Sequence, residues 1–241
     1  MIRENAMITF SRKIASIAAL AIILASPVFA QQSDPHKLVQ AATDSILAEV
    51  ELAKEYYDTT PEKLNNKVLE VLDPVVDFYG FTRNVMGKYA SSKAYRALKT
   101  KQERAAFKAR VDQFHPILRS TLIATYGKGL MAFSGEKVEL LAPTDTDKEK
   151  INSGDSVLLT QKITAQDGAV YTLRYKSRPN KKGQWQVRNL YIENLDLGRV
   201  YRSQFAAAVR DNGGDVQAAI AAWKTTAHAD VGKAKISDVE R

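Results

Sequence analysis

Three observations predict an α+β fold. Apolar residues recur at helical spacing between residues 35 and 127, four strand-like segments follow between residues 137 and 192, and helical spacing returns after residue 199. A hydrophobic period that changes from about 3.6 to about 2 and back is typical of helices packed on one sheet. Because short turns join the four segments, we expect them to pair as an antiparallel meander.

The N-terminus reads as a secretory signal peptide. Arg12 and Lys13 are basic, residues 14–24 are mostly apolar, and Ala30 ends a run of residues typical of a signal-peptidase site. A membrane anchor is the alternative, but this apolar run is shorter than the roughly 20 residues that cross a bilayer. We therefore expect residues 1–30 to be cleaved and the rest to be soluble and exported, into the periplasm.

Length and composition limit what the exported part can be. We expect one domain over residues 31–225 and a polar, flexible tail over 226–241. The absence of cysteine excludes disulfide bonds, thiolate metal sites and thiol catalysis. The net charge of +8 would suggest nucleic acid in the cytoplasm, whereas export favours anionic lipid or an acidic protein as partner.

Start and stop signals divide the first half of the chain into helices. Asp34-Pro35 and Thr60-Pro61 open two helices, the second of which should end near Leu72, before Pro74. Two shorter helical stretches should stop at Gly80 and Gly87. A long helix should run from a capping box at Thr100 and Glu103 to Gly127, with a kink or a break near residues 113–115 caused by Pro116.

The second half combines strands and two closing helices. Turn residues, including the segment 145–154, separate the four strands, and the closing helices should cover residues 199–210 and 215–223. The strands are expected at residues 137–141, 155–164, 169–177 and 184–192.

The strand pattern predicts a sheet that is apolar on both faces. Tyr171, Leu173 and Tyr175 share one face of the third strand. On the fourth strand, Trp185, Val187 and Tyr191 alternate with Leu190 and Ile192. Such a sheet needs two covers or a ligand. Two arrangements are compatible with this pattern. In one, helices cover both faces of the sheet and enclose a solid core, and in the other, the sheet and helices curl around an apolar pocket.

Charge is concentrated in one stretch. Nine basic residues and a single acid, Glu103, lie between Arg83 and Arg110. This stretch is either a solvated helical face or a docking surface for an anionic membrane or an acidic partner. The three histidines lie in separate segments, and no nucleotide-binding or nucleophile motif is present, so we expect no metal site and no cofactor.

Two segments resemble a known family. The segment from Val71 through Phe81-Thr82-Arg83-Asn84-Val85-Met86-Gly87-Lys88-Tyr89 is similar to one family segment. The run Trp185 to Glu193, followed by Tyr201-Arg202-Ser203-Gln204-Phe205, is similar to its distal signature. The family is that of the MlaC-type periplasmic phospholipid-binding proteins, also called toluene-tolerance auxiliary proteins. The sequence departs from the signature at Asn194, where glycine is usual, and at Val200, which replaces an asparagine.

The resemblance implies a soluble carrier with no catalysis and no metal. It implies that diacyl phospholipid is shuttled between an outer-membrane lipoprotein complex and an inner-membrane lipid transporter, with transient membrane contact and no role for nucleic acid. It also implies a system of outer-membrane lipid asymmetry and organic solvent tolerance. We therefore expect helices packed on a curved antiparallel sheet of about four strands, with the acyl chains between them.

Candidate residues follow from combining this expectation with the apolar and basic patterns. The apolar candidates for the lipid pocket are Val76, Phe81, Val85, Tyr89, Leu118, Leu122, Val157, Leu159, Leu173, Tyr175, Leu190 and Ile192. The basic candidates for partner or membrane docking are Arg83, Lys88, Lys93, Arg96 and Lys99. The alternatives are an exported small-ligand-binding protein or enzyme on a cone-shaped α+β fold, and a partner-binding scaffold with a solid core.

Overall fold

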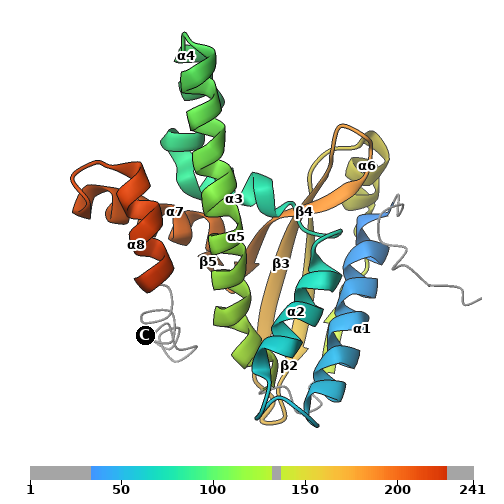
Figure 1. The fold of residues 1–241 in the computed structure, drawn as a ribbon. Coiled ribbons are helices and arrows are strands. Elements are labelled where there is room, and N and C mark those ends of the chain that lie inside the picture. The colour runs from blue at the N-terminus through green and yellow to red at the C-terminus, as the bar shows by residue number, and fades with distance from the viewer. Residues whose placement is uncertain (1–33, 132–136, 227–241) are drawn as a thin grey trace, which may run out of the picture.

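The computed structural model describes residues 34–131 and 137–226, and it has the predicted α+β architecture. The signal peptide and nearly all of the tail predicted from the sequence lie outside these residues. In Figure 1, α1 and α2 lie over one face of the sheet, α5 stands beside them, and α7 and α8 extend the helical part away from the sheet. The helices are α1 (Pro35–Ala53), α2 (Pro61–Leu72), α3 (Phe78–Met86), the short 3₁₀ helix η2 (Gly87–Ala90), α4 (Ser92–Ala97), α5 (Lys101–Met131), α6 (Asp145–Ser153), α7 (Leu197–Asp211) and α8 (Val216–Thr226).

The sheet is an antiparallel meander in the order β1-β2-β3-β4-β5. Its fifth strand, which was not expected, has only two residues and pairs with the end of β4. A segment of this length is too short to show a hydrophobic period. The strands are β1 (Lys137–Leu140), β2 (Val157–Thr164), β3 (Val170–Pro179), β4 (Trp185–Ile192) and β5 (Leu195–Asp196).

A β-bulge corrects the predicted faces of the sheet. Lys176 pairs with Asn189 but Ser177 pairs with Val187, so Arg188 is an extra residue in β4. Because side chains alternate along a strand, this extra residue brings the two halves of β4 onto one face. The inner face therefore carries Trp185, Val187, Leu190 and Ile192 together.

The expectation that both sheet faces need an apolar cover was thus wrong. The opposite face carries exposed Lys162 and Lys176, and Leu158 is 39% exposed there. Tyr191, also on that face, packs under the guanidinium of Arg174 at 5.4 Å from the ring centre. Trp185, Val187, Leu190 and Ile192 of β4 therefore all face the same interior.

Gly80 does not end a helix, as the sequence suggested, but lies inside α3. Its amide donates to the Asp77 carboxylate, which caps the helix, over 2.9 Å. A Cβ at this position would collide with the same carboxylate. Glycine here makes room for the helix cap rather than terminating the helix.

The structure differs from the expectations about helices in three further places: no break occurs at Pro116, the long helix ends beyond Gly127, and a helix forms within residues 145–154. α5 continues through Pro116 without a break and ends at Met131 rather than near Gly127. Pro116 and Asp112, whose carbonyl loses its helical donor, are both exposed, so water can satisfy that carbonyl. The expected turn over residues 145–154 contains α6, which has a capping box at Thr144 and Asp147 and a left-handed Gly154 after its last residue.

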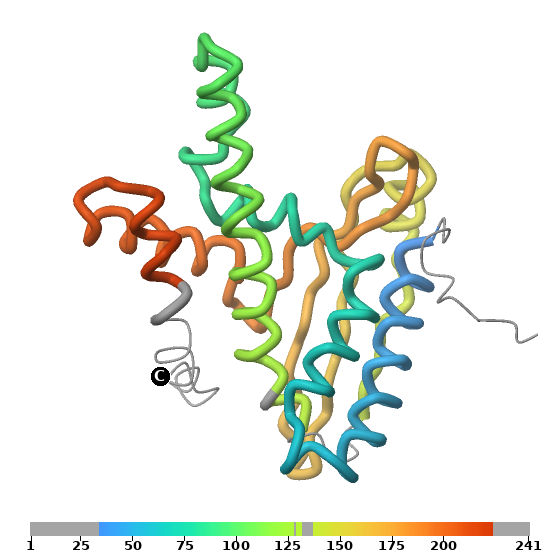
Figure 2. The backbone as a smooth tube through the Cα atoms, in the orientation of Figure 1, coloured from blue at the N-terminus to red at the C-terminus, as the bar shows by residue number. Residues whose placement is uncertain are grey.

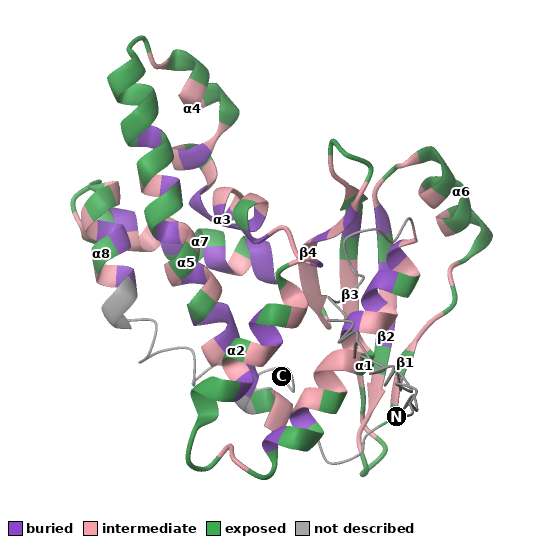
Figure 3. Cartoon of the chain, turned by 45° about the vertical axis from the view of Figure 1, so that its right-hand side comes forward, coloured by how far each residue is buried: buried purple, intermediate pink, exposed green. Residues whose placement is uncertain are grey.

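The buried apolar residues form two clusters. All buried residues are purple in Figure 3. The sheet cluster joins α1 to the sheet and consists of Leu38, Val39, Ala42, Val75, Val157, Leu159, Trp185 and Val187. The helical cluster consists of Val50, Ala53, Leu64, Val68, Leu69, Phe78, Phe81, Val85, Met86, Ala90, Phe107, Val111, Phe114, Leu118, Leu122, Ile123, Leu197, Tyr201, Phe205, Val209, Ala219, Ile220 and Trp223. Val76 contacts both clusters.

Candidate functional site

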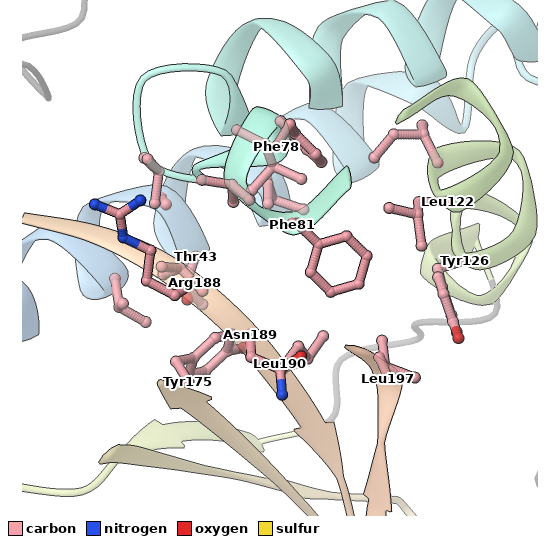
Figure 4. A pocket seen from close by; sticks show the side chains of 18 residues that line it. Thr43, Phe78, Phe81, Leu122, Tyr126, Tyr175, Arg188, Asn189, Leu190 and Leu197 are labelled. Carbon is pink, nitrogen blue, oxygen red and sulfur yellow. The ribbon is translucent and has the colours of Figure 1, made fainter. Parts of the chain in front are cut away.

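A cavity of about 210 Å³ lies where the two clusters meet. Val39, Ala42 and Val187 line it from the sheet cluster, and Phe81 and Leu122 line it from the helical cluster. Figure 4 shows Phe81 directed into the middle of the cavity, opposite side chains of β4 and α5. The cavity is therefore a seam between two packed regions and not a defect within one of them.

The polar atoms deep in the wall bond to one another. The Tyr175 hydroxyl donates to Gln161 Oε1 over 2.7 Å, and Gln161 Nε2 donates to Thr43 Oγ1 over 2.9 Å. Burial raises the pKa of Tyr175, so its hydroxyl stays protonated. With these groups paired, what the wall offers a ligand is mainly hydrocarbon.

Asn189 and Arg188, at the bulge, also have structural partners. Asn189 Nδ2 donates to Asp196 Oδ1 over 2.8 Å, and Asn189 Oδ1 accepts from the Gly198 amide over 3.0 Å, which fixes the start of α7. The Arg188 guanidinium, labelled in Figure 4, forms an ion pair with Asp77 of the connection between α2 and α3. Burial lowers the pKa of Arg188, and the Asp77 carboxylate compensates its charge.

An apolar cavity of this size is suited to hydrocarbon. Engineered cavities of about 150 Å³ lined by aliphatic and aromatic side chains stay free of water and bind benzene or xenon. The present cavity is larger, at about 210 Å³, and comparably apolar. Across residues 34–131 and 137–226, no group of three or more His, Cys, Asp or Glu side chains is placed to hold a metal ion.

The cavity wall contains some of the residues expected from the sequence. The pocket candidates that line it are Val76, Phe81, Leu122, Tyr175 and Leu190. They come from the α2–α3 connection, α3, α5, β3 and β4, so the predicted combination of short helices, long helix and sheet does meet at one place.

The other pocket candidates lie away from this wall. Val85 and Leu118 are enclosed within the helical cluster, and Tyr89 packs against it with its ring 6.1 Å from that of Phe205. Val157 and Leu159 belong to the sheet cluster. Leu173 and Ile192 pair with each other on the inner face of the sheet, and Ile192 packs against the helical cluster. A buried apolar position on the correct element is thus not necessarily a position on the cavity.

Several wall residues were not selected from the sequence. α1 contributes Val39, Ala42 and Ile46, which follow helical spacing but were not chosen as part of a site. Tyr126 and Leu197 complete the wall from α5 and α7. Of these wall residues, only those of α1 gave a signal in the sequence, because they recur three and four residues apart.

The predicted docking residues lie on α3, η2, α4 and the turn that follows. Arg83 is partly structural, because its Nε and Nη2 atoms donate to the Ala90 carbonyl over 3.3 and 3.2 Å. Lys93, Arg96 and Lys99 are exposed. Figure 2 shows α4 and the first turns of α5 projecting beyond the rest of the molecule. We name this projection, residues 91–110, the basic hairpin.

Within the described ranges, no helix is long and apolar enough to cross a membrane.

Comparisons with known proteins agree with this architecture. A curated relative, "Toluene tolerance protein ttg2D" from Pseudomonas putida, is 28% identical over 201 residues, which cover 83% of each chain. A solved structure, that of a phospholipid-binding protein from Ralstonia solanacearum in complex with a phospholipid, superposes with a TM-score of 0.63. It is 21% identical and covers 83% of this chain and 99% of its own. Residues 40–225 match the family described as MlaC protein, and the chain belongs to this family.

Proposed function

We propose that this protein is a periplasmic phospholipid carrier that binds an acyl chain in the cavity between its two clusters. The observation that carries the proposal is the apolar cavity itself, whose deep polar groups are bonded to each other. Membership of the MlaC family and the fold shared with a phospholipid-bound protein support it. No catalytic step is part of this function.

A carrier is needed because lipid does not cross water unaided. Each buried methylene contributes about 0.8 kcal/mol, so a diacyl lipid with on the order of 30 methylenes faces roughly 20 kcal/mol on leaving a bilayer. A protein wall of hydrocarbon removes most of that cost. We propose that the lipid moves between an outer-membrane lipoprotein complex and an inner-membrane transporter, as the family resemblance implies.

The size of the cavity indicates how it is loaded. A cavity of about 150 Å³ holds one benzene ring, so a cavity of about 210 Å³ holds a segment of one acyl chain and not two chains side by side. A second chain requires the walls to separate. Because the walls belong to different clusters, they can separate without disruption of either cluster.

The experiment is lipid analysis of protein purified from cells. We expect at least one diacyl phospholipid per chain by native mass spectrometry and by organic extraction. Ala42→Phe, which fills the cavity from α1, should lose most of this lipid. The matched control is Ala48→Phe on the exposed face of the same helix, which should keep it. Folded wild-type protein without phospholipid would refute the proposal.

A further inference from the structure

Aromatic side chains line the cavity on several sides. Phe78 and Phe81 come from α3, Tyr126 comes from α5, and Tyr175 comes from β3. Figure 4 shows the ring of Phe81 directed into the middle of the space. A ligand in the cavity therefore meets the faces and edges of rings as well as aliphatic side chains.

The volume of the cavity is that of a small ring compound. A cavity of about 150 Å³ holds one benzene molecule, and the present cavity has a volume of about 210 Å³. A whole acyl chain exceeds this space, whereas a six-membered ring with a short alkyl substituent fits within it. The cavity can thus accept such a ring while the two clusters stay in place.

The chemistry of the wall favours an aromatic ring over an aliphatic one. Aromatic rings attract one another in offset or edge-to-face arrangements, and this attraction adds to the gain from buried area. The deep polar side chains Thr43, Gln161 and Tyr175 already bond to one another, so a ligand needs no polar group to satisfy them. The matching ligand is an uncharged hydrocarbon ring.

Tyr126 marks a place where the cavity wall reaches the surface. This side chain lines the cavity and is 37% exposed. Its hydroxyl belongs to the polar end of an otherwise apolar side chain, and burial, the first cause, raises its pKa, so it stays neutral. A small uncharged ligand therefore meets no charged group at Tyr126.

We propose that the lipid-free cavity binds one monocyclic aromatic hydrocarbon, such as benzene or an alkylbenzene, against the ring of Phe81. An acyl chain uses the same walls, so the two ligands exclude each other. This exclusion rests on the proposed function, whereas the aromatic site rests on the cavity alone. Aromatic hydrocarbons partition into membranes, so they would occupy empty carriers and slow lipid loading.

The test measures the melting temperature of lipid-free protein by circular dichroism in sealed cells. Benzene is titrated towards its solubility limit, and we expect a rise of about 2–4 °C, because a ligand that binds only the folded state stabilises it. Cyclohexane at equal concentration should give a clearly smaller rise. No rise with benzene overturns the inference, and equal rises with both ligands overturn the aromatic preference.

Matched variants assign the effect to the cavity. Ala42→Phe fills the space from α1 and should abolish the rise, whereas Ala48→Phe on the exposed face of the same helix should keep it. If Ala42→Phe does not fold, Ala42→Leu is tested and should reduce the rise. A rise that survives in the filled cavity means that benzene binds elsewhere, and the assignment is then wrong.

Phe81→Leu tests the role of the central ring. Leucine keeps the position apolar but removes the aromatic partner, so benzene should stabilise this variant no more than cyclohexane does. A benzene preference equal to that of the wild type shows that Phe81 does not hold the ligand, and the proposed place of the ring is then wrong.

A final arm separates the aromatic site from the carrier function. Protein loaded with phosphatidylglycerol should show no rise with benzene, because the acyl chain occupies the space. An equal rise in loaded and lipid-free protein overturns the shared site. Lipid binding without benzene binding overturns only the aromatic site, and benzene binding without lipid binding overturns only the proposed function.

Discussion

The helical cluster and the sheet cluster differ in how they are filled. In the helical cluster, the ring of Phe114 lies 4.7 Å from that of Phe205 and 5.4 Å from that of Trp223, so aromatic side chains fill its centre. The sheet cluster is mainly aliphatic and has a single aromatic member, Trp185. The cavity belongs to neither centre and forms where the two meet. The comparison teaches that empty space can arise between two well-packed regions and not only from poor packing within one.

The largest effect is expected from a carboxylate introduced into the helical cluster, compared with one introduced on the cavity wall. Val85→Asp buries a carboxylate inside the helical cluster, where no water can reach it, so the protein should not fold. Ile46→Asp, on the half-buried cavity wall, should fold but retain little lipid. Circular dichroism with lipid quantification measures both. If the two variants unfold alike, the cavity wall is as closed as the cluster interior and the comparison fails.

Large-to-small substitutions should sharpen the same contrast. Phe114→Ala removes a ring from the centre of the helical cluster and should lower the free energy of unfolding by about 3–5 kcal/mol. Leu122→Ala merely enlarges an existing cavity, so we expect a cost near the low end of the Leu→Ala range, about 2 kcal/mol. Urea denaturation of lipid-free protein provides the values. Equal costs would indicate that the wall is packed as tightly as the cluster.

The third prediction extends the comparison from the interior to the surface. Reversal of Lys93, Arg96 and Lys99 to glutamate should slow lipid transfer between vesicles severalfold at low salt and leave the melting temperature and bound lipid nearly unchanged. Reversal of Lys176, Lys181 and Lys182, near the turn between β3 and β4, is the control. If only the control slows transfer, docking uses the sheet end and the basic hairpin is a solvated face.

The smallest effect concerns pH. Burial, and then the nearby Arg119, hold the pKa of His115 below its ordinary value of 6.5, although Asp73 and Asp112 oppose this. The folded state therefore favours the neutral ring, and the stability that this contributes is present above 6.5 and is lost as the pH falls through the lowered pKa. His115→Gln should weaken the decrease in melting temperature between pH 7 and pH 5 slightly. An identical pH dependence in the variant would assign the decrease to other groups.

Sequence reasoning recovered the elements whose signals are local. The start of α1 at Asp34-Pro35 and of α2 at Thr60-Pro61, and the boundaries of the longer strands, are set by caps and turns that the chain itself displays. Gly80 was misread because its role depends on contact with Asp77, and α6 was missed because its exposed residues show no apolar period. In both places the feature that was missed is a helix cap, Asp77 for α3 and the Thr144–Asp147 capping box for α6.

The site could be predicted only in part for a similar reason. Spacing identifies Phe81 and Val85 equally well as buried positions of one short helix. Phe81 lines the cavity, whereas Val85 is enclosed in the helical cluster. This difference depends on where a second region of the chain packs. The face of Leu190 could not be derived either, because Tyr191 continues the alternation of Trp185 and Val187 and so hides the extra residue Arg188.

The bulge at Arg188 means that the number of residues in β4, as well as their identity, decides which side chains face inward. Trp185 and Val187, before the bulge, belong to the sheet cluster, while Leu190 and Ile192, after it, pack against the helical cluster. If all residues were kept but the strand were regular, Val187 and Leu190 would point to opposite faces, and one half of the strand would turn toward solvent. A homologue without the bulge should therefore also lack one residue between these two positions, because a regular strand then keeps both halves on the inner face.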